Sequence, residues 1–179
     1  MAGDFIGGYG CAFDDYRIVH NIWTENCDGV VRGRKMEYCK MKEENIDSVI
    51  RRYVSYYNDS EGGCWTYEKA WKRIHQIMTM EDSQCVIQYE HGNMTGFAMG
   101  YYKVFDDLTA YYLEEIVIFK NYQNQGYGTA LLEEIEKMVK KKGAEHIEFI
   151  CMKDEHHMHF YGKLGYYASE RIALMGKHF

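Results

Sequence analysis

Residues 123–128, QNQGYG, place two glycines one residue apart directly before a helical pattern. They follow a short run of β-branched and aromatic residues, which favours a strand over a helix. After the second glycine the apolar residues Leu131, Ile135 and Val139 recur at helical spacing. A strand that leads through a glycine turn into a helix presents backbone N–H groups and the positive end of the helix dipole to an anion. This order of elements therefore predicts a phosphate-binding loop.

Three phosphate-binding patterns differ in the residues around their glycines. The dinucleotide fingerprint needs a third glycine and a position directly after the first strand, and neither is present. The P-loop needs lysine and then serine or threonine after its last glycine, whereas Thr129 follows Gly128 directly. The third pattern, Gln/Arg-x-x-Gly-x-Gly/Ala, is matched at every fixed position by residues 123–128.

This third pattern is the cofactor loop of the GNAT superfamily of acyl-CoA N-acyltransferases, which the chain resembles in a second place. Residues 160–166, FYGKLGY, closely resemble the Phe-Tyr-x-x-x-Gly-Phe segment that follows the loop in that superfamily. The resemblance implies an α/β (α+β) fold with a mixed, largely antiparallel central sheet of six to seven strands and helices on both faces. It assigns residues 34–179 to the acetyltransferase domain and leaves residues 1–33 as an N-terminal extension, a short hairpin or an arm.

The resemblance also implies acetyl-CoA as the co-substrate and no metal. The loop would hold the pyrophosphate, and the backbone N–H of Ile118 would donate to the thioester carbonyl or to the pantetheine arm. Gln123 stands where arginine is more frequent, which removes a charge but keeps a donor. The residues expected to bind the cofactor are Ile116, Ile118, Gln123, Asn124, Gln125, Gly126, Tyr127, Gly128, Thr129 and Asp154.

Glu114 and Glu115 lie on the predicted strand just before the loop. An alkylammonium with a pKa of about 10.4 must lose a proton before it can attack a thioester, and a carboxylate can take that proton directly or through water. Successive strand residues face opposite ways, so only one of the pair can face the cleft unless a bulge intervenes. Residues 112–115, YLEE, resemble the part of diamine and polyamine acetyltransferases whose first acidic residue handles the amine. We therefore favour Glu114 as the base or amine-binding carboxylate, with Glu115 as the alternative.

Tyr161 matches the tyrosine that GNAT enzymes use to protonate the leaving thiolate. An ordinary phenol pKa of about 10 keeps it protonated, although a tyrosine that only packs is the alternative. His157 stands where the family often has a small residue and could change the choice of acceptor. His156 and His159 could share a helix face, but no carboxylate partner is placed for a metal, so we expect no metal site.

The composition limits the partners. A chain of 179 residues with 46% hydrophobic residues is long enough for one domain with a sizeable core. The net charge of -6 argues against nucleic acid and is compatible with a cationic acceptor. No apolar run approaches the roughly 18 residues of a membrane span, and no signal segment follows Met1. The six cysteines form no CxxC pair, so we expect reduced thiols in a cytoplasmic protein.

Periodicity and turn residues predict the elements around the loop. Thr66 is the expected N-cap of a helix that runs through Met80 with Trp71 and Ile74 facing inward. Gly143 is expected to end the helix after the loop. The other predictions are a strand over 36–41, a helix from residue 45, strands over 84–89 and 95–104 around a turn at 91–93, a strand from residue 109, a strand over 146–152, a helix over 155–164, and one or two closing strands over 167–177.

Two function classes remain. The first is an N-acetyltransferase for the primary amine of a small cationic molecule, polyamine-like or aminoglycoside-like, with a protein lysine or N-terminus as the alternative acceptor. The second is a catalytically weak acyl-CoA-binding sensor module. Tyr161 and Glu114 together favour the enzyme, whereas His157 leaves the sensor module as an alternative. We expect no nucleic-acid or membrane partner, and a homodimer is compatible with the resemblance.

Overall fold

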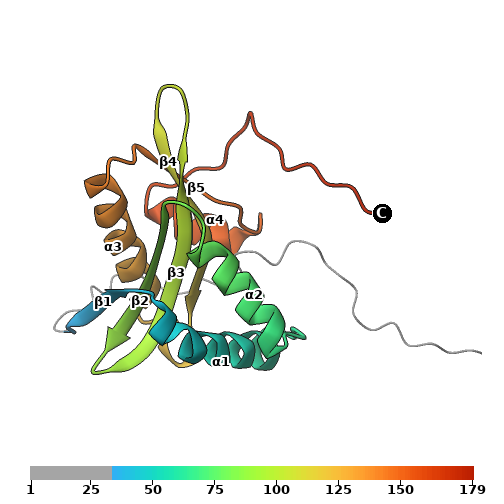
Figure 1. The fold of residues 1–179 in the computed structure, drawn as a ribbon. Helices are drawn as coiled ribbons and strands as arrows, with labels where there is room; N and C mark the ends of the chain where they lie inside the picture. Colours follow the sequence, from blue (N-terminus) through green and yellow to red (C-terminus); the bar gives the residue numbers. More distant parts are fainter. Residues whose placement is uncertain (1–33) are drawn as a thin grey trace, which may run out of the picture.

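The computed structural model describes residues 34–179, which are built around one five-stranded sheet (Figure 1). The strands lie in the order β1-β2-β3-β4-β5 and are antiparallel except for the parallel pair β4 and β5. The strands are β1 (Met36–Lys40), β2 (Ser83–Glu90), β3 (Asn93–Val104), β4 (Thr109–Ile118) and β5 (His146–Glu148). The helices are α1 (Glu43–Ser60), α2 (Tyr67–Met78), α3 (Tyr127–Lys141), α4 (Glu155–Lys163) and the short 3-10 helix η1 (Lys120–Tyr122).

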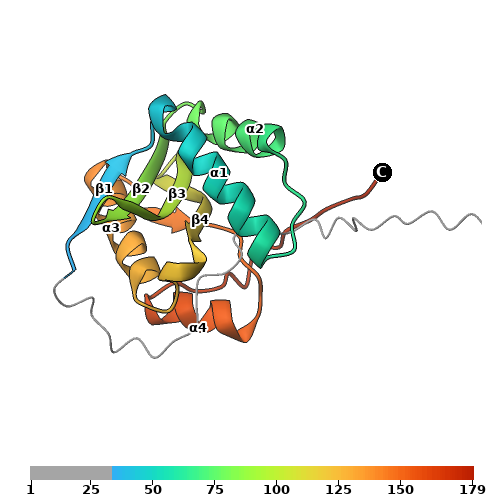
Figure 2. The ribbon, with the colours of Figure 1, turned by 90° about the horizontal axis from the view of Figure 1, so that it is seen from below.

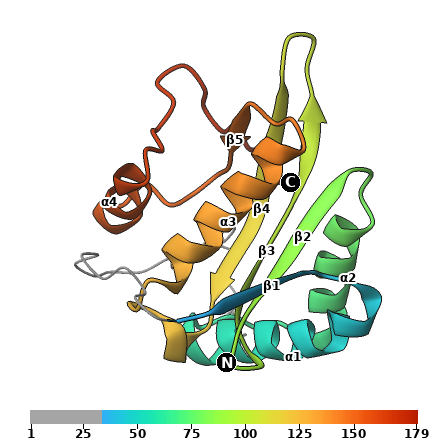
Figure 3. The same cartoon turned by 90° about the vertical axis from the view of Figure 1, so that its left-hand side faces the viewer.

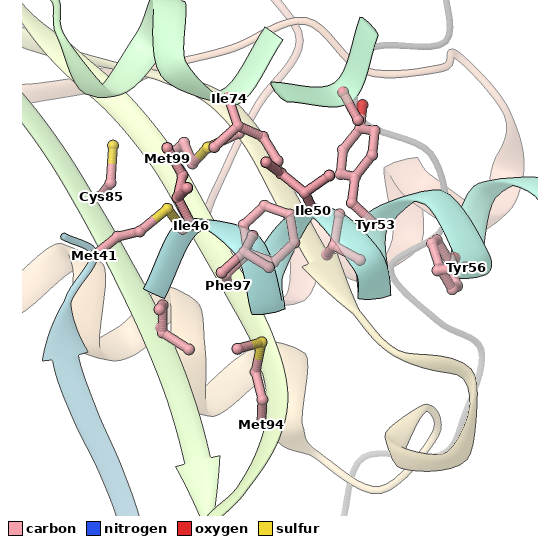
Figure 4. Close-up of a cluster of buried hydrophobic side chains, with 14 of the residues drawn as sticks. Met41, Ile46, Ile50, Tyr53, Tyr56, Ile74, Cys85, Met94, Phe97 and Met99 are labelled. Atoms are coloured by element: carbon pink, nitrogen blue, oxygen red, sulfur yellow. The ribbon is translucent and has the colours of Figure 1, made fainter. Parts of the chain in front are cut away.

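Helices cover both faces of this sheet, as predicted (Figure 2). Helices α1 and α2 lie on one face, and α3 and α4 lie on the other. Figure 4 shows the core between the sheet and helices α1 and α2, where Ile46, Ile50 and Ile74 meet Phe97 and Met99 of β3. None of the helices within residues 34–179 is long and apolar enough to span a bilayer.

Local sequence signals set several element ends. His91 and Gly92 have positive φ angles of 48° and 76°, which gives the two-residue turn that joins β2 to β3. The Thr66 side chain accepts a hydrogen bond from the backbone N–H of Lys69 and caps α2. Gly143 follows α3 with a φ of 95°, a conformation that glycine adopts without steric cost. These three predictions are confirmed.

The prediction that Trp71 faces the core is wrong. Its side chain is 41% exposed and stacks on His75 at a ring-centroid distance of 4.4 Å. The buried face of α2 is formed by Ala70, Ile74 and Ile77. Because Ala70 lies four residues before Ile74, the small residue takes the inward position and the indole next to it turns outward.

Strand β4 contains a bulge where it pairs with β3. Met99 lies opposite Glu115 and Gly100 lies opposite Leu113, so Glu114 is an extra residue with no partner in the register. A side chain at Gly100 would place its Cβ 2.3 Å from the carbonyl oxygen of Tyr112, so only glycine fits this approach of the two strands. The bulge changes which face of the sheet each later β4 residue points to.

Strands β4 and β5 run together over a short distance and then part. The register pairs only Ala110–Tyr112 of β4 with β5, and no other described strand pairs with this edge of β4 further along. Figure 3 shows the chain leaving β5 for α4, away from the end of β4. The predicted strand over 146–152 therefore ends early, at Glu148. One edge of β4 is left open within the described part of the chain.

The closing strands predicted over 167–177 do not form. Residues 164–179 contain no strand, and Tyr167, Ile172 and Met175 have exposed fractions of 79%, 75% and 85%. A strand needs a partner, and alternating residues alone do not supply one. The sheet therefore has five strands in the described part, and the prediction of six to seven was too high. The extension predicted over residues 1–33 lies outside the described residues.

Candidate active site

The bulge in β4 brings Glu114 and Glu115 onto the same face of the sheet, where both meet Arg73 of α2. Nη1 of Arg73 lies 2.8 Å from Oε1 of Glu114, and its Nη2 lies 3.7 Å from Oε2 of Glu115. Simple alternation would place the two carboxylates on opposite faces. The expectation that only one of the two glutamates faces the cleft therefore does not hold. Both carboxylates face α1 and α2, and both contact the guanidinium of Arg73.

Glu115 is the inner member of this pair. It is 1% exposed, and its Oε1 accepts a hydrogen bond of 2.5 Å from the hydroxyl of Tyr57 on α1. Burial raises the pKa of Glu115 to about 7, while the hydrogen bond from Tyr57 and the charge of Arg73 act in the opposite direction. A carboxyl group with this pKa can hold or release a proton near neutral pH.

Glu114 is the outer member of the pair. The side chain of Glu114 is 15% exposed, whereas the side chain of Glu115 is 2% exposed. It lies two residues past Tyr112, where the pairing of β4 with β5 ends. Glu114 is therefore the carboxylate that an incoming amine could reach, and Glu115 lies behind it.

Tyr161 lies on the opposite face, on α4. It is 2% exposed and packs against Phe149 at a ring-centroid distance of 4.5 Å and against Tyr166. Its hydroxyl is buried and has no hydrogen-bond partner among residues 34–179. Burial raises the pKa of Tyr161 well above its ordinary value, so the phenol stays protonated and can donate. A buried donor without an acceptor fits a site that binds a ligand.

The open edge of β4 presents backbone donors between these two faces. The N–H of Phe119 donates to the carbonyl of Thr95 on β3 at 2.9 Å. Backbone N–H groups alternate in direction along a strand, so the N–H groups of Ile116 and Ile118 point to the opposite edge, away from β3. They therefore lie on the edge that β5 has left. This placement fits an extended chain with carbonyl groups, such as a pantetheine arm.

The loop before α3 has the geometry of an anion site. Asn124 and Gly126 have positive φ angles of 59° and 87°, and α3 begins at Tyr127. No described side chain caps this helix, and its first turn contains no acidic residue. The N–H groups of Tyr127, Gly128 and Thr129 therefore open the helix with its dipole directed at any bound anion. These residues fit a pyrophosphate.

Arg34 brings a positive charge to this loop. Its guanidinium donates to the hydroxyl of Tyr127 at 3.0 Å and to Oε1 of Gln125 at 3.4 Å. It also lies 3.8 Å from Glu90, which receives a further hydrogen bond from Tyr127. Arg34 lies just before β1, so the segment that leads into this strand supports the loop.

Two predicted cofactor residues direct their side chains elsewhere. Gln123 is buried and donates to the carbonyl of Ile118 at 2.8 Å and to the hydroxyl of Tyr56 at 3.3 Å. The backbone N–H of Gln123 donates to the carbonyl of Lys120 at 3.4 Å, so Gln123 supports the fold of the loop and offers no free N–H group to a phosphate. Both carboxylate oxygens of Asp154 are used by His157, one by its backbone N–H at 2.9 Å and the other by its Nδ1 at 2.6 Å. Asp154 therefore caps α4 and holds His157.

The sequence did not single out Arg73 and Tyr57. A signal existed for each, because Arg73 falls on the apolar face of α2 three residues after Ala70, and Tyr57 lies four residues after the buried Tyr53 of α1. A charged residue on the buried face of a helix needs a partner of opposite charge. Only the sheet register shows that this partner is a pair of glutamates.

The comparisons with known proteins agree with this fold. The model of the acetyltransferase (GNAT) family matches residues 47–166, which is more than half of the chain. The chain therefore belongs to the acetyltransferase (GNAT) family, and it is an enzyme of that class. A search of curated proteins found no significant match.

Solved structures show the same fold at low sequence identity. A possible acetyltransferase from Clostridium difficile 630 aligns with a TM-score of 0.69 at 13% identity, over 80% of this chain and 98% of that chain. A putative acetyl transferase from Pyrococcus furiosus aligns with a TM-score of 0.63 at 21% identity, over 81% and 100%. An aminoglycoside N-acetyltransferase in complex with CoA aligns with a TM-score of 0.61 at 14% identity, over 84% and 99%.

Proposed function

We propose that this enzyme transfers the acetyl group of acetyl-CoA to a primary amine of a small cationic molecule, polyamine-like or aminoglycoside-like, by direct attack on the thioester. The observation that carries the proposal is the position of Glu114. It is a partly exposed carboxylate at the point where β4 parts from β5, next to an open edge of backbone donors. An ammonium bound there would lie beside any thioester held along that edge.

The charges of the site favour a cation. Glu114 and Glu115 share the single guanidinium of Arg73, so the cluster is negative when both carboxyl groups are ionised. An ammonium bound at Glu114 would neutralise the remaining negative charge. With Glu115 at a pKa of about 7, the cluster can also accept the proton that the ammonium must lose.

The residues divide the reaction between two faces of the sheet. Bound acetyl-CoA would supply an acetyl thioester along the open edge of β4. Glu114 would bind the ammonium and take its proton, directly or through water, so that the nitrogen can form a bond to the thioester carbon. The N–H of Ile118 would donate to the thioester oxygen. Tyr161 would give its proton to the sulfur as the carbon–sulfur bond breaks. The nitrogen would lose its second proton, which would return through water to the oxygen of Tyr161, so that the neutral amide and CoA leave and Tyr161 is restored.

The proposal is tested by thiol release from acetyl-CoA with a panel of amines: an alkyl monoamine, an alkyl diamine, an aminoglycoside and a lysine peptide. We expect turnover with small cationic amines and a loss of about 100-fold in kcat/KM for Glu114→Gln. Glu134→Gln is the matched control, because Glu134 pairs with Lys137 on the surface of α3. Equal rates for Glu114→Gln and the wild type would overturn the role of Glu114. Binding of acetyl-CoA without thiol release for any amine would overturn the proposed function.

A further inference from the structure

A second cation site lies on the same face of the sheet as Glu114, and a side chain of the protein itself fills it. Nζ of Lys103 on β3 lies 3.7 Å from the ring centroid of Tyr112 and 2.8 Å from Oε1 of Glu148. The ring of Tyr101 lies beside that of Tyr112, at 6.0 Å from the same ammonium. A ring face together with a carboxylate is a recognised combination for binding an ammonium. Lysine carries a primary alkylammonium, which is the chemical group that the proposed acceptor carries.

Tyr101, Tyr112 and Glu148 form a cage around the ammonium of Lys103. The sheet register places this cage next to Glu114, where the reacting amine is proposed to bind. Tyr112 precedes Glu114 by two residues, so both side chains project from the same face of β4. Glu148 lies directly across from Tyr112 on β5. Strand spacings put the α-carbons of Glu114 and Glu148 about 8 Å apart. The pKa of Tyr112 is raised to about 12, first by burial and then by the charge of Glu114, which agrees with this proximity.

The cage is open enough for its ammonium to be replaced. The side chains of Lys103 and Glu148 are 33% and 30% exposed. Both line a cavity of about 780 Å³ along the outer edge of β5, together with Tyr112. Because an ion pair that is partly exposed to solvent contributes little to stability, an external ammonium can compete with that of Lys103.

We infer that Tyr112 and Glu148 form a second subsite for the acceptor, which binds its distal ammonium in the place of Lys103, so that the preferred acceptor is an aliphatic diamine. This inference rests on the proposed function and names the class of its acceptor. Glu114 would bind the reacting nitrogen, and Glu148 would bind the second nitrogen one strand away. Lys103 competes for the subsite and limits its affinity.

The same combination of groups elsewhere in the chain provides a matched control. Nζ of Lys142 lies 4.2 Å from the ring centroid of Tyr102 and 3.2 Å from Oδ1 of Asp82. Tyr102 belongs to the core on the α3 face of the sheet, opposite to the face of Glu114. Lys142, Tyr102 and Asp82 thus repeat the combination of lysine, tyrosine and carboxylate, but they have no part in the proposed subsite. Replacing Lys142 or Asp82 is therefore a matched control.

The test compares the KM of diaminobutane with that of butylamine, which has the same chain and one nitrogen. We expect Glu148→Gln to raise the ratio of the two KM values about tenfold, and Lys103→Met to lower it several-fold. Lys142→Met and Asp82→Asn are expected to leave the ratio unchanged. An unchanged ratio in both Glu148→Gln and Lys103→Met would overturn the subsite.

Direct binding separates this inference from the proposed function. Calorimetric titration of diaminobutane into the enzyme with CoA present needs no turnover. A weaker affinity in Glu148→Gln than in the wild type supports the subsite even if no amine is acetylated, in which case the proposed function alone would fail. Equal affinities in the two proteins would overturn the subsite while leaving the acetyl transfer untouched.

Discussion

The hydroxyl of Tyr57 on α1 donates a hydrogen bond of 2.5 Å to Oε1 of Glu115 on β4. Both groups are buried, and the bond joins the helix that covers one face of the sheet to the bulged strand. Arg73 reaches the same carboxylate from α2. The two helices therefore fix the inner carboxylate of the site.

Replacing Tyr57 by phenylalanine removes this donor and leaves an oxygen of Glu115 without its partner in the core. We expect Tyr57→Phe to lower the free energy of unfolding by about 1–3 kcal/mol in denaturant titrations. The control is Tyr67→Phe, because the hydroxyl of Tyr67 bonds Asp47 at the exposed surface and its loss should not change stability measurably. Equal effects of the two substitutions would contradict the buried bond.

The raised pKa of Glu115 makes the stability of the protein depend on pH. The ordinary value is 4.5 and the value in the fold is about 7, so the folded state keeps this proton over a range in which the unfolded chain has lost it. The resulting stabilisation is complete below 4.5 and is lost as the pH rises through about 7. We expect unfolding free energies of the wild type to fall by on the order of 3 kcal/mol more than those of Glu115→Gln between these two pH values. Parallel curves for the two proteins would show that Glu115 has an ordinary pKa.

Arg73 balances two carboxylates in a largely buried place. Removing it in Arg73→Met should destabilise the protein by about 3 kcal/mol, because Glu114 and Glu115 would then repel each other without a cation. Arg51→Met is the control, since Arg51 pairs with Asp47 on the exposed side of α1 and should give no measurable change. Thermal unfolding of the two variants side by side distinguishes these cases. An Arg73→Met protein as stable as the wild type would show that the two carboxylates do not need this cation.

The close approach of β3 and β4 at the bulge requires glycine. A Cβ at Gly100 would lie 2.3 Å from the carbonyl oxygen of Tyr112 and 2.6 Å from the ring of Tyr111. We expect Gly100→Ala to cost about 2 kcal/mol or more and to lower the activity, because the strands must separate where Glu114 is presented. In α4, by contrast, a Cβ at Gly162 meets nothing within 4 Å, so Gly162→Ala should stabilise by about 0.5–1 kcal/mol. Equal stabilities would mean that the bulge adapts freely.

The parts of the fold that sequence could predict are those set by neighbouring residues. The turn at His91 and Gly92, the cap at Thr66 and the helix end at Gly143 each depend on a few adjacent positions, and all three are confirmed. The order of strand, glycine loop and helix around Gly126 is confirmed for the same reason. Such signals need no information about distant segments.

The parts that sequence could not predict depend on how distant segments pair. A bulge is a property of two strands, so alternation along β4 alone could not place Glu114 and Glu115 on one face. Arg73 gains its role only because α2 lies over that bulge. The strands predicted over 167–177 show the converse, because their alternating residues find no partner strand and remain exposed.

The most direct test of the account is the rate of thiol release from acetyl-CoA by Tyr161→Phe. Because the hydroxyl of Tyr161 has no partner among residues 34–179, its removal should not lower stability, and the protein should bind acetyl-CoA as the wild type does. We predict a fall in kcat of about 100-fold at unchanged affinity for acetyl-CoA and unchanged unfolding. A kcat equal to that of the wild type, with the same amine at saturation, would contradict Tyr161 as the proton donor to the sulfur.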